Sequence, residues 1–255
     1  MLLAAVVLLA YMTLVYVYAL KIKNNSIADI AYGGGFVIVG GTAFAVGSQP
    51  KIGLYVLGLV LFWAIRLSGR IYKRNHKKPE DFRYAAWRKQ WKWLKLRSYL
   101  QVFVLQGVII YIVALPILAI AVHPTQSLHV ASLLLGSLVW LIGYFFEVVG
   151  DAQLDAFLKI RPEKRPTKFI ESGLWRYTRH PNYFGEATMW WGLAIIANGN
   201  SSLGLIIWAS PVLITYLLLF VSGVPLLEKR WAGDKAWEKY KAKTSVFLPL
   251  PPKGN

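Results

Sequence analysis

The chain has 255 residues, of which 56% are hydrophobic and only 16% are charged, whereas roughly a quarter of the residues of a soluble domain are charged. Its 29 Lys and Arg residues outnumber 12 Asp and Glu residues, the formal net charge is +17, and cysteine is absent. This composition leaves too little polar surface for a soluble protein and excludes disulfides, thiolate nucleophiles and thiolate metal sites. A nucleic-acid-binding protein could share the charge but not the long charge-free runs, so we predict an all-α polytopic membrane protein.

Six apolar runs define the predicted membrane helices. A helix needs about 20 residues to cross the hydrocarbon core, and the runs are, in chain order, 1–20, 30–47, 52–65, 98–122, 128–149 and 187–227. The third is short and can span only if its ends snorkel to the interface. Pro116 predicts a kink in the fourth, and the turn signal at 198–202 splits the last run in two. Seven helices result. The first lacks the basic residues that precede the apolar stretch of a signal peptide, so we expect it to be retained.

The distribution of basic residues predicts the orientation of these helices. With the N-terminus outside and the C-terminus cytoplasmic, segments 21–29, 66–97, 150–183 and 228–255 all face the cytoplasm. They hold 28 of the 29 basic residues, and only Lys51 falls on the other side. Cytoplasmic loops carry such an excess of Lys and Arg, which are attracted to anionic lipid headgroups. Most of the positive charge is therefore explained by topology and by contact with membrane lipids.

Three acidic residues lie near the ends of predicted membrane helices. Asp29 opens the second helix, Glu147 ends the fifth and Glu186 opens the sixth. An acid within the membrane costs at least about 2.5 kcal/mol on insertion scales, so each needs a partner or a function. A structural ion pair would explain any one of them alone, whereas three acids at one membrane depth favour a shared pocket.

The segment 171–186 combines cations, aromatic residues and an Asn–Glu pair. Pro181 suits the first turn of the sixth helix, which places Asn182 and Glu186 on one face. Arg and Lys suit phosphates, Tyr and Trp suit a base or ring, and Asn with Glu suits a carboxamide. These are the parts needed to bind a nicotinamide dinucleotide, although a plain basic linker is the alternative. Asp151 continues the fifth helix beyond the membrane.

The motif RHPNYFGE at 179–186 resembles the C-terminal half of the steroid 5-alpha-reductase family. The resemblance continues through LEKR at 227–230, WEKY at 237–240 and FLP at 247–249, and DFRY at 81–84 is similar to bacterial membrane proteins of that family. It covers roughly residues 60–250. Sterol carbon–carbon double-bond reductases share the motif, and isoprenylcysteine carboxyl methyltransferases and phospholipid methyltransferases carry a related RHP-x-Y-x-G.

The resemblance implies a seven-helix bundle in the bacterial inner membrane, or in the endoplasmic reticulum of a eukaryote, that binds NADPH in a cytoplasm-facing cavity. Residues 1–97 would form the substrate side, and residues 98–255 would carry the NADPH-binding loops, within a single membrane domain. The residues that it assigns to the cofactor are Asn182 and Glu186 for the carboxamide, Asp151 toward the ribose, Lys168, Arg179 and Arg230 for the phosphates, and Tyr177, Tyr183, Trp190 and Tyr240 as cavity walls.

The reaction implied by the resemblance is hydride transfer from NADPH to the β-carbon of an α,β-unsaturated ketone in a steroid or other lipid. A donor aimed at the carbonyl oxygen would stabilise the transition state, and a protonated acid in an apolar pocket can be that donor. Asp29, with Tyr32 one turn on, is the candidate. A membrane methyltransferase that uses S-adenosylmethionine and a non-catalytic lipid-binding protein are the alternatives.

Overall fold

Helices form nearly all of the regular structure in the computed structural model, which describes residues 1–254. Within those residues β pairing is limited to two isolated bridges, Pro124 with Ser201 and Thr178 with Ser245. The all-α prediction is confirmed. The chain divides into two compact units, Met1–His129 with Ala197–Ala209 and Val130–Ile196 with Ser210–Asn255. The sequence-based division at residue 97 falls inside the first unit, and the roles assigned to its two parts remain predictions.

The first unit begins with three long helices, α1 (Leu2–Ile22), α2 (Ile27–Val46) and α3 (Lys51–Asn75). Two short helices follow, α4 (Phe82–Gln90) and α5 (Leu94–Ser98). A π-helical turn, η1 (Tyr99–Val104), leads into α6 (Leu105–Val113) and α7 (Leu115–Val122), and η4 (Gly204–Trp208) belongs to the same unit.

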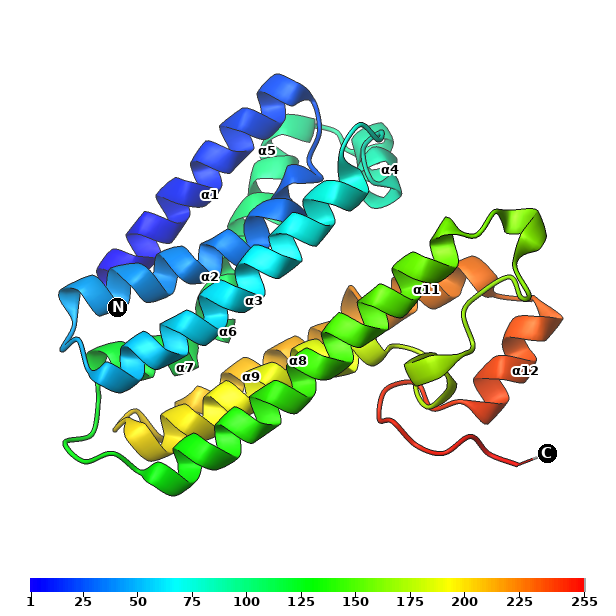
Figure 1. The fold of residues 1–255 in the computed structure, drawn as a ribbon. Coiled ribbons are helices and arrows are strands. Elements are labelled where there is room, and N and C mark those ends of the chain that lie inside the picture. Colours follow the sequence, from blue (N-terminus) through cyan, green and yellow to red (C-terminus); the bar gives the residue numbers. More distant parts are fainter. Residues whose placement is uncertain (255) are drawn as a thin grey trace. The chain divides into compact units, whose positions relative to one another are not determined.

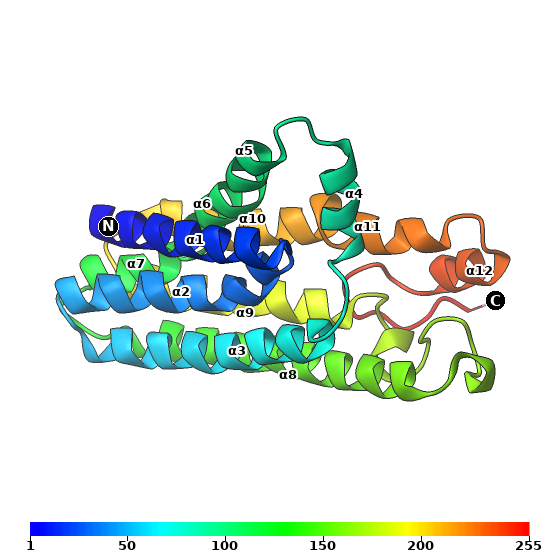
Figure 2. The ribbon, with the colours of Figure 1, turned by 90° about the horizontal axis from the view of Figure 1, so that it is seen from above.

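Helix α2 is the central helix of the first unit, because it packs against α1, α3, α6 and α7. Figures 1 and 2 both show it between α1 and α3. Its glycines bring these neighbours close: a Cβ atom on Gly33 would lie 3.0 Å from the backbone oxygen of Ala64 on α3, and one on Gly35 would lie 2.7 Å from Ile110 of α6. Small residues let membrane helices approach in this way. The position of α2 matters for function because it carries Asp29 and Tyr32.

The second unit is built on the long helix α8 (Val130–Lys159) and on most of α9 (Pro181–Asn200). Between them lie two 3₁₀ turns, η2 (Pro162–Lys164) and η3 (Gly173–Arg176). The chain then continues through α10 (Ala209–Tyr216), the π-helical turn η5 (Leu217–Val221), α11 (Val224–Glu228), η6 (Lys229–Trp231) and α12 (Lys235–Lys243).

Glycines spaced seven residues apart bring α8 and α9 into backbone contact. A Cβ atom on Gly143 would lie 2.6 Å from the backbone oxygen of Gly185, and one on Gly136 would lie 2.5 Å from that of Gly192. A seven-residue spacing is close to two helical turns, so these glycines stay on one face of each helix. At the next step along α8, a Cβ on Gly150 would meet Pro181, at 3.0 Å. The first turn of α9 is thereby fixed against α8 at Gly150.

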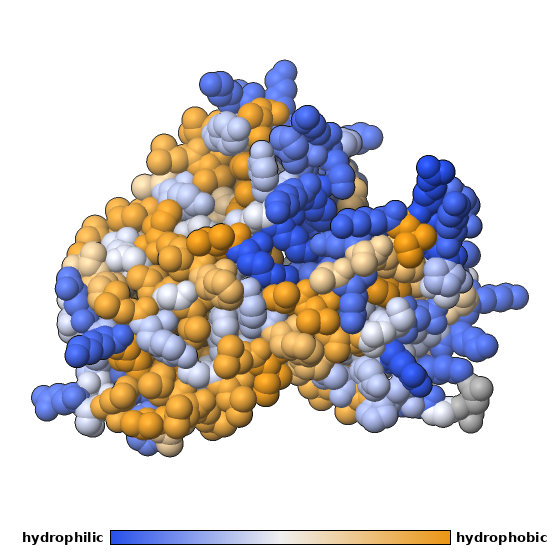
Figure 3. Space-filling model, viewed as in Figure 1, coloured by the Kyte–Doolittle hydropathy of each residue, from blue (hydrophilic) through white to orange (hydrophobic). Residues whose placement is uncertain are grey.

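Six helical segments are long and apolar enough to cross a membrane: α1, α2, α3, Leu94–Val113, α8 and Gly204–Trp231. The chain is therefore an integral, multi-pass membrane protein. The sixth helix of the predicted seven corresponds to α9, which is not among these segments, because Glu186 and the asparagines near both of its ends keep its mean hydropathy low. Figure 3 shows hydrophobic residues over the body of the first unit and hydrophilic ones over α4; in the second unit, hydrophilic residues gather over α12.

Two of the predicted helix bounds were wrong. The run 52–65 was expected to close at Arg66, but α3 continues to Asn75 and is 25 residues long, because Arg is a good helix former and no proline follows it before Pro79. The run 98–122 was expected to form one kinked helix. It is instead broken at Ala114, two residues before Pro116, into α6 and α7. The turn predicted at 198–202 is confirmed, since α9 ends at Asn200.

Candidate functional site

The RHPNYFGE segment opens α9, and Pro181 is the first residue of the helix, as predicted. Proline suits this position because the first N–H groups of a helix have no intrahelical acceptor. The side-chain amide of Asn182 donates a hydrogen bond to Asp151 of α8 over 3.2 Å. Asp151 is only 3% exposed, and a buried carboxylate needs such donors. The structure thus brings together two residues that the sequence assigns to one site.

More acidic and aromatic side chains extend this polar pair along the two helices. Glu186 lies one turn beyond Asn182 on the same face of α9, and Glu147 lies one turn before Asp151 on α8. Glu147 is buried, and a Cβ atom on Gly185 would lie 2.4 Å from its backbone nitrogen. Trp190 lies one further turn along the same face of α9 and is 1% exposed. The result is an amide and three acids where the first turns of α9 lie against α8.

Glu228 of α11 holds the first two residues of the motif. Its Oε1 atom lies 2.9 Å from Nε of Arg179 and 3.0 Å from Nε2 of His180. Arg179 is 7% exposed and also donates from Nη1 to the backbone oxygens of Lys241, at 3.2 Å, and Thr244, at 2.6 Å. Arg179 was predicted to face phosphates. Most of its donors are instead directed at protein acceptors that tie α9, α11 and the end of α12 together.

The ring of His180 is fixed on one side and unsatisfied on the other. Because a carboxylate paired with Arg179 only accepts hydrogen bonds, Nε2–H of His180 donates to Glu228. The ring stacks on Tyr183, with centroids 5.5 Å apart and planes 9° apart. Its Nδ1 atom is buried and has no hydrogen-bond partner within residues 1–254. Such an atom is costly unless something else satisfies it.

The remaining predicted cofactor residues lie in or around an aromatic cluster of the second unit. Tyr240 is buried against Phe169 and Trp237, and its hydroxyl group donates to the backbone oxygen of Trp175 over 2.5 Å. It is therefore part of a packed core in this arrangement. Lys168 is 67% exposed and pairs with Asp234 over 2.6 Å. Tyr177 and Arg230 are exposed.

Asp29 of the first unit is held by the segment that follows α3. Its carboxylate accepts from Nη2 of Arg83 at 2.6 Å and from the hydroxyl group of Tyr84 at 2.7 Å. Burial and the negative charge of Asp29 raise the pKa of Tyr84, so its hydroxyl keeps its proton near neutral pH. Burial alone would lower the pKa of Arg83, but the charge of Asp29 raises it overall. Both carboxylate oxygens of Asp29 therefore accept hydrogen bonds from side chains of α4, and its role as a donor to the substrate remains a prediction.

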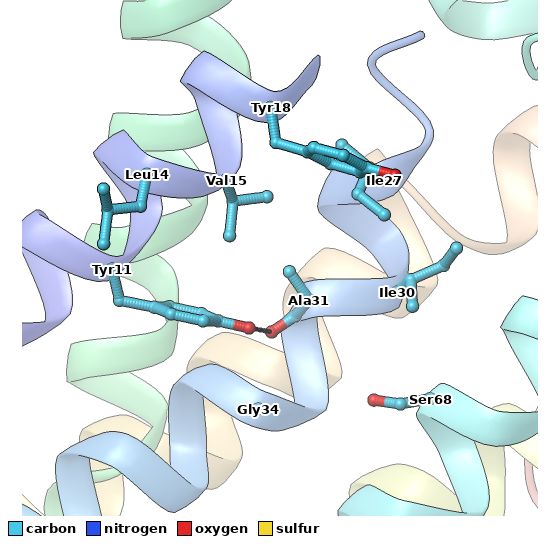
Figure 4. Close-up of a pocket in the computed structure, with 9 residues that line it drawn as sticks. All are labelled: Tyr11, Leu14, Val15, Tyr18, Ile27, Ile30, Ala31, Gly34 and Ser68. Carbon is cyan, nitrogen blue, oxygen red and sulfur yellow. Dashed lines mark hydrogen bonds between the residues drawn. The ribbon is translucent and has the colours of Figure 1, made fainter. Parts of the chain in front are cut away.

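Tyr32 lies on the same side of α2 as Asp29, where its ring packs edge-on against Phe36 and Trp63, at 5.0 and 6.3 Å between centroids. An apolar groove of about 600 Å³ lies on the other side of α2, between it and α1 (Figure 4). Ile30 and Gly34 line it from α2, and Tyr11 donates across it to the backbone oxygen of Ala31 over 3.0 Å. Residues 30 and 34 are about half a helical turn from 29 and 32. The groove therefore does not adjoin the proposed catalytic pair.

Three side chains at these sites were missed by sequence reasoning, namely Glu228, Arg83 and Tyr84. They belong to the LEKR and DFRY segments, and the resemblance of those segments to a family was the only signal that pointed to them. Their partners lie 48 to 55 residues away in the chain, beyond the reach of local patterns.

Comparison with known proteins bears out the family resemblance. Residues 15–244 match the family described as "Protein of unknown function (DUF1295)". The 3-oxo-5-alpha-steroid 4-dehydrogenase 1 of Bos taurus is 28% identical over 130 residues, which cover 51% of this chain and 46% of that protein. The chain thus aligns with about half the length of this curated relative. No solved structure gives a significant match.

Proposed function

The chain belongs to the DUF1295 family, and we propose that it is an NADPH-dependent reductase of the carbon–carbon double bond of an α,β-unsaturated ketone in a steroid or other lipid. The observation that carries this proposal is the Asn182–Asp151 pair at the start of α9, set in a motif shared with steroid 5-alpha-reductases. The 28% identity to a steroid dehydrogenase points the same way.

The polar groups at the start of α9 fit a nicotinamide carboxamide. A carboxamide offers both a donor and an acceptor, and Asn182 with Glu186 provides the complementary groups. Asp151 accepts a hydrogen bond from the Asn182 amide, and we assign it to accept another from a ribose hydroxyl group. The buried Nδ1 atom of His180 has no partner in residues 1–254, as expected for an atom that a bound ligand satisfies. Tyr183 and Trp190 would form walls of the same cavity.

Exposed cations would hold the phosphates. Arg230 is exposed, and the pair between Lys168 and Asp234 is a surface ion pair, which is worth little and gives way readily to a stronger anion. We assign Arg179 a positioning role, because its donors hold Glu228 and the C-terminal backbone. Tyr177 and Tyr240 would support the cavity from the loop and from the aromatic cluster.

NADPH, when bound, would supply the hydride that adds to the β-carbon of the enone, and the resulting enolate would take a proton from solvent at its α-carbon to complete the reduction. The chain must then stabilise negative charge on the carbonyl oxygen. We propose that Asp29 and Tyr32 act there. Asp29 orients the guanidinium group of Arg83, which keeps further N–H groups to donate to that oxygen, and Tyr32 contributes a phenolic hydroxyl group. The spanning helices would admit a lipid-like substrate from the bilayer.

The proposal is tested by ligand-induced stabilisation of the full-length protein purified in detergent. At 100 times its Kd a cofactor should stabilise the fold by about 2.7 kcal/mol, which a thermal-shift measurement detects. We expect NADPH to stabilise the protein and Glu186→Ala to abolish the shift, whereas Glu163→Ala, an exposed acid in η2, should keep it. Turnover would then be sought with testosterone and progesterone.

Two results would replace this proposal. Stabilisation by S-adenosylmethionine and not by NADPH would make the pocket that of a methyltransferase. A flat response to both nucleotides would favour a non-catalytic lipid-binding protein.

A further inference from the structure

A second pocket of the first unit lies where two membrane spans end. Its volume is about 230 Å³, and it lies between the C-terminal end of α1 and the start of the span Leu94–Val113. One wall is apolar, formed by Ala19, Leu20 and Leu94. Since both spans reach the membrane surface at this level, the pocket is at the depth of the lipid headgroups.

The opposite wall carries more positive than negative charge. Arg88 pairs with Glu80 through two hydrogen bonds of 2.8 Å and donates to the backbone oxygen of Lys23 over 3.2 Å. Lys23 and Lys95 also line the pocket, and neither ammonium group has a carboxylate within 4.0 Å in the part of the chain that the structure describes. Glu80 balances one of three cations. A surplus of two positive charges in a partly enclosed pocket attracts an anion.

The polar floor of the pocket is rigid before any ligand arrives. Asn25 is buried, its side-chain amide donates to Ser98 over 3.1 Å, and its backbone N–H donates to Glu80 over 2.7 Å. Lys23 and Trp93 flank the pocket with φ angles of 53° and 59°. Left-handed conformations are costly for residues other than glycine and persist only where the surroundings enforce them. The lysine at the end of α1 is thus held in place at some cost in free energy.

We propose that this pocket binds the phosphate group of an anionic glycerophospholipid. Lysine ammonium groups act as point charges that suit a phosphate, and Arg88 is pre-oriented by Glu80. The apolar wall at Ala19 and Leu20 continues along α1 into the membrane, which favours a headgroup with attached acyl chains over a free phosphate. Bound lipid would also brace the segment that carries Arg83 and Tyr84, because Arg88 lies on the same helix, α4.

The test compares two variants that remove the same charge from the same region. Lys23→Gln combined with Lys95→Gln removes both unpaired lysines of the pocket. Lys89→Gln combined with Lys92→Gln removes two exposed lysines nearby that do not line it. The full-length protein is reconstituted into phosphatidylcholine nanodiscs with increasing phosphatidylglycerol, and retained lipid is counted by native mass spectrometry.

We expect the pocket variant to bind phosphatidylglycerol on the order of tenfold more weakly and the control variant to change less than about twofold. Lys23→Arg with Lys95→Arg should restore binding, which shows that charge rather than folding is responsible. Equal losses in the pocket and control variants would overturn the proposal. Displacement of the lipid by millimolar inorganic phosphate would identify a soluble anion as the ligand and would overturn the lipid assignment.

Discussion

The guanidinium group of Arg179 and the carboxylate of Glu228 lie 2.9 Å apart, although 49 residues separate them in the chain. This ion pair is largely buried, and Arg179 also holds the backbone of Lys241 and Thr244. It therefore determines where the C-terminal segment lies relative to the start of α9, and hence the surroundings of Asn182.

Replacing Arg179 with Ala should destabilise the protein before any cofactor is added. Of the two side-chain partners described for the largely buried Glu228 carboxylate, removing Arg179 leaves only the His180 ring, and breaking a buried ion pair costs about 3–5 kcal/mol. We expect a lower Tm in the ligand-free protein and faster limited proteolysis after α11. Arg176→Ala, which removes an exposed arginine three residues earlier, should change neither. A variant of Arg179 with normal Tm and weakened NADPH binding would instead return this residue to a phosphate-binding role.

Replacing Gly185 with Ala should separate α8 from α9. The new methyl group would lie 2.4 Å from the backbone nitrogen of Glu147, so the backbone must shift. Overpacking of this kind costs typically about 1–3 kcal/mol, and it should also weaken NADPH binding because Asn182 moves away from Asp151. Gly69→Ala on α3 is the matched control, since a Cβ there meets no atom within 4 Å. Equal Tm and equal NADPH affinity in the two variants would contradict the role given to the α8–α9 contact.

Local signals predicted the helices better than the partners of the site residues. Pro181 marks the start of α9 and 198–202 its end, because proline and turn residues act on their own backbone. The end of α3 was placed too early because Arg66 was taken as the end of the helix. A charged residue marks where an apolar run ends, whereas the helix itself continues to Asn75. Asp29 was identified from its cost inside a membrane, but Arg83 and Tyr84 were not, since their approach depends on how the segment after α3 folds back.

Replacing Asp29 with Asn should lower kcat/KM for an enone substrate on the order of a hundredfold, because Arg83, the proposed donor to the carbonyl oxygen, loses the carboxylate that orients it. Asp81→Asn is the control. Asp81 also contacts Arg83, at 2.8 Å, and caps α4, and Asn caps helices equally well. The two variants change the charge identically. Equal losses of activity would show that only the charge balance of Arg83 matters and would remove Asp29 from the proposed reaction.

Glu80 should make the fold sensitive to acid. Partial burial by itself raises the pKa of Glu80, but hydrogen bonds from Arg88 and from the backbone of Asn25 lower it below the ordinary value of 4.5. Because the pKa is lower in the folded state, its contribution to stability is complete above about pH 4.5 and is lost as the pH falls through the folded-state pKa. We expect the Tm of the wild-type protein to fall between pH 5 and pH 3 more steeply than that of Glu80→Gln.

The matched control for this pH dependence is Glu238→Gln on α12, an exposed acid whose nearest cation, on Lys241, is 3.9 Å away. Its Tm profile should follow that of the wild type, since surface pairs contribute little to stability. Parallel profiles for wild type and Glu80→Gln would mean that Arg88 does not hold Glu80 in its charged form. The proposal that Glu80 pre-orients Arg88 in the lipid pocket would then be contradicted, because it depends on the same carboxylate.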